Sequence, residues 1–508
     1  MHLFRRLAVL SLFLITAAAF GQTFRGTLSG NVTDATGASI ANVPVQLTNP
    51  ATGAVLKFTT NSAGDFSFPE LAVGKYNLSV SYPGFASKKI DDIDVAVSKV
   101  TNLRVQLEIG KQDTVIDVVA NGVQTDTTSS ALVALIDSKS VQEIPMNGRN
   151  FTQMVTLSAG VNISKSVNGS RTNSINYQVD GSDNNDPWSN AVASNQGGVA
   201  GIAGGLIPIE AIDQFSMQNN AEADMGRDAG ANSNMVLRSG TNNIHGDVFY
   251  FDRNEYFASL SPVNVPGSRV PEIRNHQGGF TLGGPILKDR TFLFLAGEIQ
   301  LANANNNVGD TVLSDAWIGS ATQLLAKHGL TPNTVASNLY AGNGTLAGLY
   351  PANSKGGAAV TSNYLSAGRN SYNSYNGVIK LDHRFNDREL LSIHYIGTTG
   401  TQTADVGSHY ADYFQTAPMH IHNFSVVQNS VFSPRLVNQI TFASGYFLQT
   451  FNDANQNFNP AGLGLNLGLT GKLAQGATMI NITGFDTVGE TSPLGRTDVT
   501  EHVTDSLH

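Results

Sequence analysis

Apolar and polar residues alternate along most of the chain, and turn residues interrupt the alternation at short intervals. Within residues 24–109, Tyr76, Leu78 and Val80 fall on one face of a strand, with polar residues between them. A period of two over short segments bounded by Gly, Pro and Asn is typical of antiparallel β-structure. We therefore predict a small antiparallel β-sandwich over residues 24–109.

The pattern changes after this sandwich. Residues 110–128 are polar, lack a sustained period, and are expected to be a linker that contains one short strand. Residues 129–240 mix a strand-like run near Val133, a helix-like run at Phe151–Leu157, and a helix followed by a strand near Ile212. They also hold long loops rich in Gly, Ala and Asn, and loops of that length inside a compact domain are usually functional. The prediction for this part is a small mixed α/β unit.

Longer alternating segments, separated by polar loops, fill residues 241–508. Ile379, Leu381 and Phe385 fall on one face of a strand, with charged residues on the other, and the segment 438–449 alternates in the same way. Alternating segments of about ten residues with aromatic residues near their ends are the weak signature of outer-membrane β-barrel strands, apolar toward lipid and polar toward the lumen. A second soluble sandwich would give the same period, so alternation alone does not decide between the two.

Composition narrows the function classes. Hydrophobic residues make up 41% of the chain, charged residues only 14%, and the net charge is −9. The chain can therefore build cores, but an acidic balance argues against nucleic acid as a partner, because phosphate binding needs a clustered basic face. The chain has no cysteine, which excludes disulfides, thiolate catalysis, Cys-based zinc sites and a lipid-bearing cysteine.

The first residues show the three regions of a secretory signal peptide. Arg5 and Arg6 precede the apolar run Leu7–Ile15, and small residues follow up to Gly21. This order favours a cleaved signal over residues 1–21 rather than a buried N-terminal helix. No later segment approaches the roughly 20 apolar residues of a transmembrane helix. An exported membrane protein of this sequence would have to cross the membrane with strands.

The predicted sandwich carries a spaced set of glycines and aromatic residues: Gly30-x-Val32-x-Asp34-x-x-Gly37, Pro44-Val45, and Gly64-x-Phe66-x-Phe68-x-x-Leu71-x-x-Gly74-x-Tyr76. The set resembles the carboxypeptidase regulatory-like domain, which carries no peptidase chemistry of its own. No His stands in an HxxE or HExxH spacing, so the zinc ligands of a peptidase are missing. Two roles stay open for this domain: a spacer, or sugar binding by its loops, which only fold analogy supports.

A series of short motifs follows in order along the rest of the chain. They are Asn147-Gly148-Arg149-Asn150-Phe151; Val179-Asp180-Gly181; Pro208-Ile209-Glu210-Ala211-Ile212; Arg238-Ser239-Gly240-Thr241-Asn242 with Ile244, His245 and Gly246; and Gly283-Gly284-Pro285-Ile286 with Lys288-Asp289-Arg290-Thr291-Phe292. With the sandwich in front, the series resembles the Oar-like TonB-dependent outer-membrane transporters over nearly the whole mature chain. One motif would be weak evidence, but the ordered series behind an export signal favours a barrel over a second soluble sandwich.

The resemblance implies a mainly-β protein with a periplasmic sandwich, an α/β plug domain over residues 129–240, and the first part of an antiparallel transmembrane β-barrel over residues 241–508. Large barrels of this kind are plugged. The first two motifs would belong to the plug, and Arg238–Gly246 to the plug–barrel junction. The implied location is the outer membrane of a Gram-negative-type bacterium. The implied partners are outer-membrane lipid, the periplasmic energy-transducing protein TonB, and an unidentified imported ligand, for which carbohydrate and peptide are candidates.

Transporters of this family also need an energy-coupling segment, the TonB box, just before the plug. A segment at this place resembles it loosely: Asp113, Thr114, Val115, Ile116, Asp117, Val118, Val119 and Ala120. An extended segment of this kind can add as a strand to a partner, because backbone hydrogen bonds demand little of the sequence. The alternative is that this β-branched run is simply the last strand of the sandwich.

Other candidate sites are weak. The oxygens of Asp180, Asp183, Asn184, Asn185 and Asp186 suit calcium, but their spacing does not fit a calcium loop, and Asx-rich turns are common for backbone reasons. A plain turn is favoured there.

His420 and His422 share a strand face and could ligate a transition metal. Because no third ligand accompanies them, a lumen-lining role is favoured. No serine stands in a G-x-S-x-G elbow. We expect no enzymatic activity, no metal and no cofactor.

The length departs from the resembled family. At about 10 residues per strand plus turns and loops, residues 241–508 accommodate on the order of ten strands, whereas a plugged transporter has about 22. We expect the sequence to be a truncated product or partial gene model. Unpaired sheet edges in lipid cost several kcal/mol per group, so this chain alone is expected neither to insert stably nor to transport. The alternative function is a secreted or surface β-sandwich protein that binds carbohydrate or acts as an adhesin.

Overall fold

The protein is described here by a computed structural model of the 508-residue chain. The described residues are 25–110, 115–119, 133–187, 190–193, 198–199, 202–203, 205–219, 230–260, 269–341, 348–350, 361–406, 408–410, 413–433, 436–456, 459–471, 476, 478–489 and 494–507. The predicted signal peptide, residues 1–21, lies outside them.

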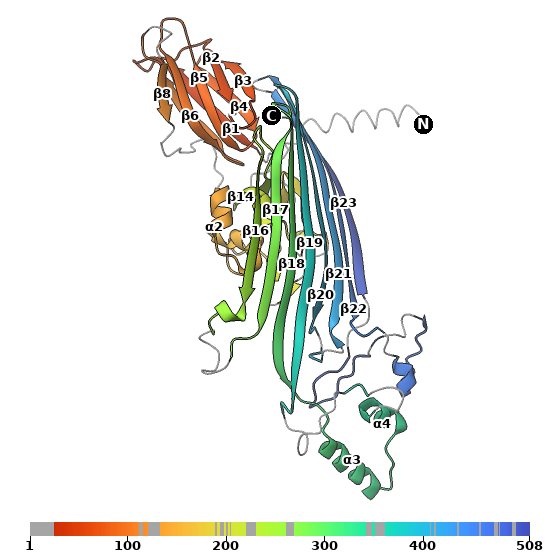
Figure 1. The fold of residues 1–508 in the computed structure, drawn as a ribbon. Helices are drawn as coiled ribbons and strands as arrows, with labels where there is room; N and C mark the ends of the chain where they lie inside the picture. The colour runs from red at the N-terminus through yellow and green to blue at the C-terminus, as the bar shows by residue number, and fades with distance from the viewer. Residues whose placement is uncertain are drawn as a thin grey trace, which may run out of the picture.

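The N-terminal domain is a β-sandwich of two sheets, with strand orders β4-β1-β7 and β3-β2-β5-β6-β8 (Figure 1). Its strands are β1 (Gly26–Thr33), β2 (Pro44–Thr48), β3 (Val55–Thr59), β4 (Asp65–Leu71), β5 (Gly74–Val80), β6 (Ser87–Val95), β7 (Val100–Gln106) and β8 (Val115–Val119). Tyr76, Leu78 and Val80 all point into the core, as predicted. The prediction of a purely antiparallel sandwich is wrong, because β7 runs parallel to β1 and β8 runs parallel to β6.

The middle domain is a small α/β unit around one mixed sheet with the order β11-β10-β15-β14-β9. Its elements are β9 (Val133–Ile136), α2 (Ser138–Glu143), η2 (Asn147–Arg149), η3 (Phe151–Leu157), β10 (Ile175–Val179), β11 (Ser182–Asp183), β12 (Gly198–Val199), β13 (Ile202–Ala203), η5 (Ile209–Ala211), β14 (Ile212–Gln218) and β15 (Ala231–Leu237). The strand near Val133 and the helix-then-strand at Ile212 are confirmed. The helix over Phe151–Leu157 is also confirmed, in the 3-10 form. We call this unit the plug.

The third part is one curved antiparallel sheet of eight strands in sequence order, which we call the wall (Figure 1). Its strands are β16 (His245–Asn254), β17 (Ile273–Leu287), β18 (Thr291–Asp310), β19 (Tyr364–Asn386), β20 (Glu389–Ala404), β21 (Gln415–Ser433), β22 (Leu436–Asp453) and β23 (Leu494–Leu507). Within the described residues β16 and β23 are not paired with each other, so the wall is open rather than a closed barrel. It has fewer strands than the ten estimated because they reach 23 residues in length.

Side chains of the wall alternate as the sequence predicts. Ile379 and Phe385 on the outer face are 47% and 55% exposed, whereas Lys380 on the inner face is 4% exposed. On the outer face of β19, the residues from Tyr375 to Phe385 are apolar apart from His383. Ten residues at about 3.3 Å each, tilted by about 40°, span ~25 Å, which matches the apolar band of outer-membrane barrels. The outer face therefore fits hydrocarbon.

The structure corrects the placement of one histidine pair. His420 and His422 lie on the outer face of β21, not in the lumen. The His422 ring stacks on Tyr395, with ring centroids 5.9 Å apart, and its Nδ1 lies 2.7 Å from the Tyr395 hydroxyl. Rings with an apolar body and a polar tip suit the border between lipid and water. This preference explains how polar residues can stand on the outer face without lining a lumen.

Long loops and two helices, α3 (Asp315–Lys327) and α4 (Thr334–Ala341), lie at the end of the wall opposite the sandwich (Figure 1). The loops pack around a second apolar cluster that includes Tyr410 and Leu463. At the other end, consecutive strands are joined by short turns, for example residues 288–290 between β17 and β18. In the described part of the chain no helix is long and apolar enough to cross a bilayer.

Candidate functional site at the plug–wall interface

The plug lies against the inner face of the wall, and the two share one hydrophobic core. Its buried side chains include Phe151 and Phe215 from the plug together with Phe294 and Val378 from the wall. Every residue of β10 and β15 is buried, which is the pattern of strands that are covered on both faces. The interface between plug and wall is therefore the candidate functional site.

A buried ionic cluster joins the Val179-Asp180-Gly181 motif to the wall. Lys380 Nζ lies 3.0 Å from Asp180 Oδ2, and His394 Nδ1 lies 3.4 Å from the same oxygen. The three side chains are only 2–5% exposed. Burying a charge is costly unless the charge is paired and hydrogen-bonded. Asp180 thus fixes the plug to two wall strands, β19 and β20.

The local backbone holds this carboxylate in place. Asp180 and Gly181 form the turn of the β10–β11 hairpin at φ of 46° and 77°, the left-handed region that Asp and Gly tolerate best. Asp180 N donates to the Met235 carbonyl at 2.8 Å, and Asp180 Oδ1 accepts from Leu237 N at 3.0 Å. Lys380 Nζ also donates to the Leu237 carbonyl at 2.9 Å. Gly181 therefore allows the turn, and Asp180 makes the contact with the wall.

The charge state of Asp180 follows from these neighbours. Burial alone would raise its pKa, but the Lys380 ammonium and the His394 ring outweigh burial and lower the pKa of Asp180 to about 2. A carboxylate with an opposite charge this close stays ionised at neutral pH. The contact is therefore a true ion pair.

A second buried cluster joins two further motifs. Arg149 Nη2 donates to Glu210 Oε1, and the two side chains are 13% and 9% exposed. The guanidinium carbon of Arg149 lies 3.8 Å from the centroid of the Phe251 ring of β16, a cation–π geometry whose strength grows with desolvation. Glu298 of β18, 3% exposed, adds a second carboxylate close to Arg149 and Glu210. Arg149 therefore pairs with the buried carboxylate of Glu210 in the plug and lies close to a second buried carboxyl group from the wall.

The other residues of the Asn147–Phe151 motif support this arrangement. Arg253 of β16 donates to Asn147 Oδ1, and Gln277 Nε2 of β17 donates to the Gly148 carbonyl at 3.3 Å. Asn150 caps η3, because its Oδ1 accepts from Thr152 N at 3.0 Å. Phe151 is completely buried in the plug core. The motif is thus one continuous plug–wall contact.

The Asx-rich segment after the hairpin does more than the plain turn that its sequence predicts. Asp186 Oδ2 accepts from Arg496 Nη2 of β23 at 2.7 Å, and the Arg496 guanidinium carbon lies 4.5 Å from the centroid of the Phe447 ring. The Asp183 carbonyl accepts from Asn423 Nδ2 of β21 at 3.3 Å. Nowhere in the described ranges do three His, Asp or Glu side chains gather as a metal site. The segment ties the plug to the last wall strands.

The predicted junction residues, Arg238–Gly246, carry the chain from β15 of the plug to β16 of the wall. Arg238 Nη2 donates to the Ser138 hydroxyl oxygen, at the start of α2, at 2.9 Å. Gly240 passes so close to the wall that a Cβ there would lie 2.5 Å from the Leu293 carbonyl oxygen. The junction is thus held to the plug on one side and packed tightly on the wall on the other.

The end of the junction is tied to a turn of the wall. Asn242 Nδ2 donates to Asp289 Oδ1 at 2.7 Å, and Asp289 N donates to Asn242 Oδ1 at 2.8 Å. This reciprocal pair joins two of the sequence motifs. Thr241 Oγ1 lies 3.3 Å from His245 Nδ1. Ser239 lines a cavity between the domains, and Gly246 packs against the Thr281 backbone.

The predicted coupling segment is only partly described. Val115–Val119 form β8, which pairs in parallel with residues 87–91 of β6 and is the last strand of the larger sandwich sheet. Asp113, Thr114 and Ala120 lie outside the described residues. Residues 115–119 therefore lie where the alternative places them, as the last strand of the sandwich. The use of this segment for energy coupling stays a prediction.

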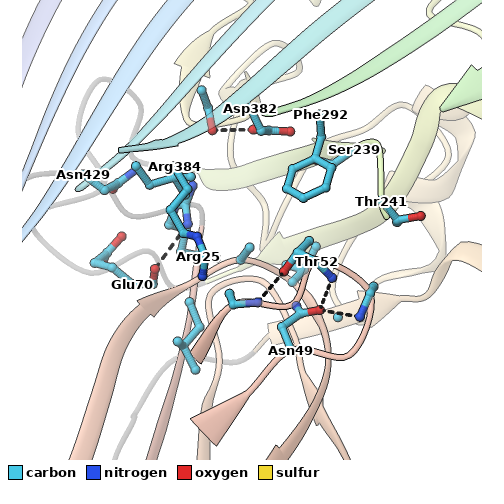
Figure 2. Close-up of a pocket in the computed structure, with 18 of the residues that line it drawn as sticks. Arg25, Asn49, Thr52, Glu70, Ser239, Thr241, Phe292, Asp382, Arg384 and Asn429 are labelled. Atoms are coloured by element: carbon cyan, nitrogen blue, oxygen red, sulfur yellow. Dashed lines mark hydrogen bonds between the residues drawn. The ribbon is translucent and has the colours of Figure 1, made fainter. Parts of the chain in front are cut away.

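A cavity of about 530 Å³ lies where the sandwich, the plug and the short-turn end of the wall meet. Figure 2 shows Arg25, Asn49, Thr52 and Glu70 on its sandwich side. The plug and wall sides include Ser239, Thr241, Phe292, Asp382, Arg384 and Asn429. The cavity is thus an interdomain space and not a pocket of any one domain.

This architecture, with a wall that is apolar outside and a plug bound to its polar inner face, defines an outer-membrane β-barrel protein. The model of the outer membrane beta barrel domain matches residues 236–508, more than half of the chain, and shows that the chain belongs to this family. Residues 27–108 match the carboxypeptidase regulatory-like domain. The regulatory-like domain and the outer-membrane barrel that the sequence predicts are confirmed.

Among characterised proteins, the chain is similar to the TonB-dependent transporter Oar of Myxococcus xanthus, with 28% identity over 308 residues. The match covers 55% of this chain and 27% of the relative, so the chain spans about a quarter of the curated relative that it matches. That relative is a transporter and not an enzyme, in agreement with the expectation of no enzymatic activity.

Two solved outer-membrane proteins are similar at low identity. A mutant of the ferric enterobactin receptor of Pseudomonas aeruginosa is 15% identical with a TM-score of 0.38, and the match covers 65% of this chain and 42% of that chain. The outer membrane transporter YddB of Escherichia coli is 9% identical with a TM-score of 0.44, and the match covers 74% of this chain and 45% of that chain.

The sequence motifs identified the plug side of the interface but not its partners on the wall. Lys380, His394, Glu298 and Arg496 belong to no motif. One signal was available, because a charged residue on the polar face of a membrane-spanning strand needs a partner in the lumen. Which plug carboxylate meets which cation depends on the three-dimensional register of plug and wall.

Proposed function

We propose that the chain is part of a TonB-dependent outer-membrane transporter that imports a ligand too large for simple porins. The observation that carries this proposal is the plug bound to the inner face of the wall by the Asp180 and Arg149 clusters. These ion pairs fix the position of the plug on the wall. Breaking them would loosen the plug. The ligand is unidentified, with carbohydrate and peptide as candidate classes.

The proposed orientation follows from the loops. Outer-membrane barrels have short periplasmic turns and longer outer loops. The sandwich lies at the short-turn end of the wall, and α3 and α4 lie at the long-loop end (Figure 1). We therefore place the sandwich in the periplasm and the two helices outside the cell. The alternative of a secreted sandwich protein without a barrel is set aside, because residues 236–508 match the barrel family.

The proposed energy-coupling partner is TonB, and its proposed contact is residues 113–120. β8 is the last strand of its sheet in the described structure, so a partner strand can approach its outer edge. Backbone hydrogen bonds would then supply affinity with little demand on side chains. Extended β-branched residues suit that role.

Val115→Pro is expected to abolish binding of the chain to the isolated periplasmic domain of TonB, because proline removes a backbone donor from the strand. Binding can be measured by biolayer interferometry with the full chain in detergent. Val115→Ala is the matched control, because it shortens the same side chain and keeps the backbone donor; its affinity should stay close to that of the original chain. Equal binding by the proline and alanine variants would contradict the coupling assignment.

A further inference from the structure

The sandwich is docked on both plug and wall rather than tethered beside them. Val97 N donates to Gln214 Oε1 of the plug at 2.9 Å. On the wall side, Gln439 Nε2 of β22 donates to Glu70 Oε2 at 3.1 Å. Because the sandwich contacts both other parts and shares the interdomain cavity with them, it covers the short-turn end of the plug.

A third contact uses the reciprocal Asn242–Asp289 pair. The loop between β2 and β3 of the sandwich lies on this pair, and the Ala51 carbonyl accepts from Asn242 N at 2.9 Å. Asn49 Oδ1 shapes the loop by accepting from Ala51 N at 2.9 Å. Two motifs of the barrel region thus form a seat for a loop of the sandwich. We call residues 49–54 the latch loop.

Gly53 makes this seating possible. It has φ of 69°, and a Cβ at this position would overlap Asp289 Oδ1 and approach Asn242 Nδ2 to 3.3 Å. A side chain at position 53 must therefore either displace the Asp289 carboxylate from its pair with Asn242 or push the latch loop away from the wall. Gly37 of the same domain has a similar φ of 89°, but a Cβ there would meet nothing within 4 Å. Gly53 and Gly37 therefore share a left-handed backbone conformation, but only Gly53 lies against the wall.

The interface of the sandwich with the plug and the wall has the features of an interface that can open. Among the described residues its direct hydrogen bonds are few, Asp289 is exposed, and a cavity of about 530 Å³ separates parts of the domain surfaces. Interfaces of this kind within a chain resemble transient protein–protein contacts. In addition, the proposed coupling strand β8 belongs to the sandwich sheet, so a pull on β8 acts on the sandwich.

We propose that the N-terminal sandwich is a detachable lid over the short-turn end of the plug, fastened by the latch loop on Asn242 and Asp289. With the lid closed, the sandwich covers the plug surface that borders the cavity. With the lid open, the sandwich no longer covers that surface, and the plug can move. Its role in import rests on the proposed function, but docking and undocking of the lid do not.

The test uses the absence of cysteine from the chain. Ser239→Cys introduces one thiol at the cavity, and its rate of reaction with a bulky maleimide reports how often the lid is open. In the full chain in detergent, adding Gly53→Asp should raise the rate at least about tenfold, the factor that a loss of ~1.4 kcal/mol of docking free energy produces. Adding Gly37→Asp should leave the rate unchanged.

A second variant tests docking without labelling. Gly53→Cys with Asp289→Cys places two thiols where the closed lid brings their side chains together, and a disulfide should form under mild oxidation. Equal maleimide rates for Gly53→Asp and Gly37→Asp, or no disulfide in the double variant, would overturn the lid. Neither measurement contains TonB or cargo, so a failure of the transport proposal would leave both results as they are.

Discussion

Asp180→Ala is expected to lower the free energy of unfolding of the plug by about 3–5 kcal/mol, the usual cost of removing one partner of a buried ion pair. The substitution leaves Lys380, whose side chain is 5% exposed, without its carboxylate in the plug–wall interface. It also removes the acceptor of Leu237 N. Hydrogen exchange of the β10 and β15 amides in the full chain measures the loss directly.

Two controls separate this effect from a general response to substitution. Asp387→Ala removes an aspartate that is 71% exposed and 3.8 Å from Arg384, and exposed pairs contribute at most about 1 kcal/mol. Lys380→Met added to Asp180→Ala removes the unpaired charge and should recover most of the stability. Equal losses for Asp180→Ala and Asp387→Ala would contradict the assigned ion pair.

The same pair predicts a pH dependence. Because the pKa of Asp180 is lowered from 3.8 to about 2 in the folded plug, the folded state binds fewer protons than the unfolded state between these values. Stability from the pair is therefore complete above pH ~4 and is lost as the pH falls toward ~2. The Asp180→Ala variant should lack this part of the acid transition.

Arg149→Ala should destabilise the plug by a similar amount, about 3–5 kcal/mol. It leaves the buried Glu210 carboxylate without its cation and removes the contact with the Phe251 ring. The readout is the hydrogen exchange of the β14 and β15 amides.

The matched control for Arg149 is an exposed ion pair of the same plug. Lys139 and Glu143 are 81% and 67% exposed, with 3.9 Å between their charged atoms. Lys139→Ala should therefore change stability by less than about 0.5 kcal/mol. A loss at Arg149 no larger than the loss at Lys139 would show that the Arg149 cluster does not hold the plug.

The alternation of residues along single strands could be predicted because it depends on local geometry. Ile379 and Lys380 take the faces that a period of two gives them, and β-branched or aromatic residues mark the strands. The glycine and Asx positions of the motifs were also informative: Gly181 stands in a turn, and Gly240 passes close to the wall.

Contacts between distant segments could not be predicted in the same way. The pairing of Asp180 with Lys380 joins residues 200 positions apart, and the seat of the latch loop on Asn242 depends on how two domains meet. The parallel placement of β7 beside β1 could not be predicted either, because alternation identifies a strand but not its neighbour or direction. Polarity alone assigns His422 to the lumen, whereas the structure places it on the outer face, where the rings of Tyr395 and Tyr446 accommodate it.

One face of the wall is expected to meet hydrocarbon, and the other face meets the plug. This arrangement can be tested by placing single cysteines along residues 376–385 of this cysteine-free chain, attaching nitroxide labels, and measuring collisions with oxygen and with a water-soluble nickel complex in detergent micelles. Labels at odd positions such as Ile379 should collide with oxygen and not with nickel, whereas labels at buried even positions such as Val378 should collide with neither. Odd positions that collide with nickel instead would contradict this arrangement.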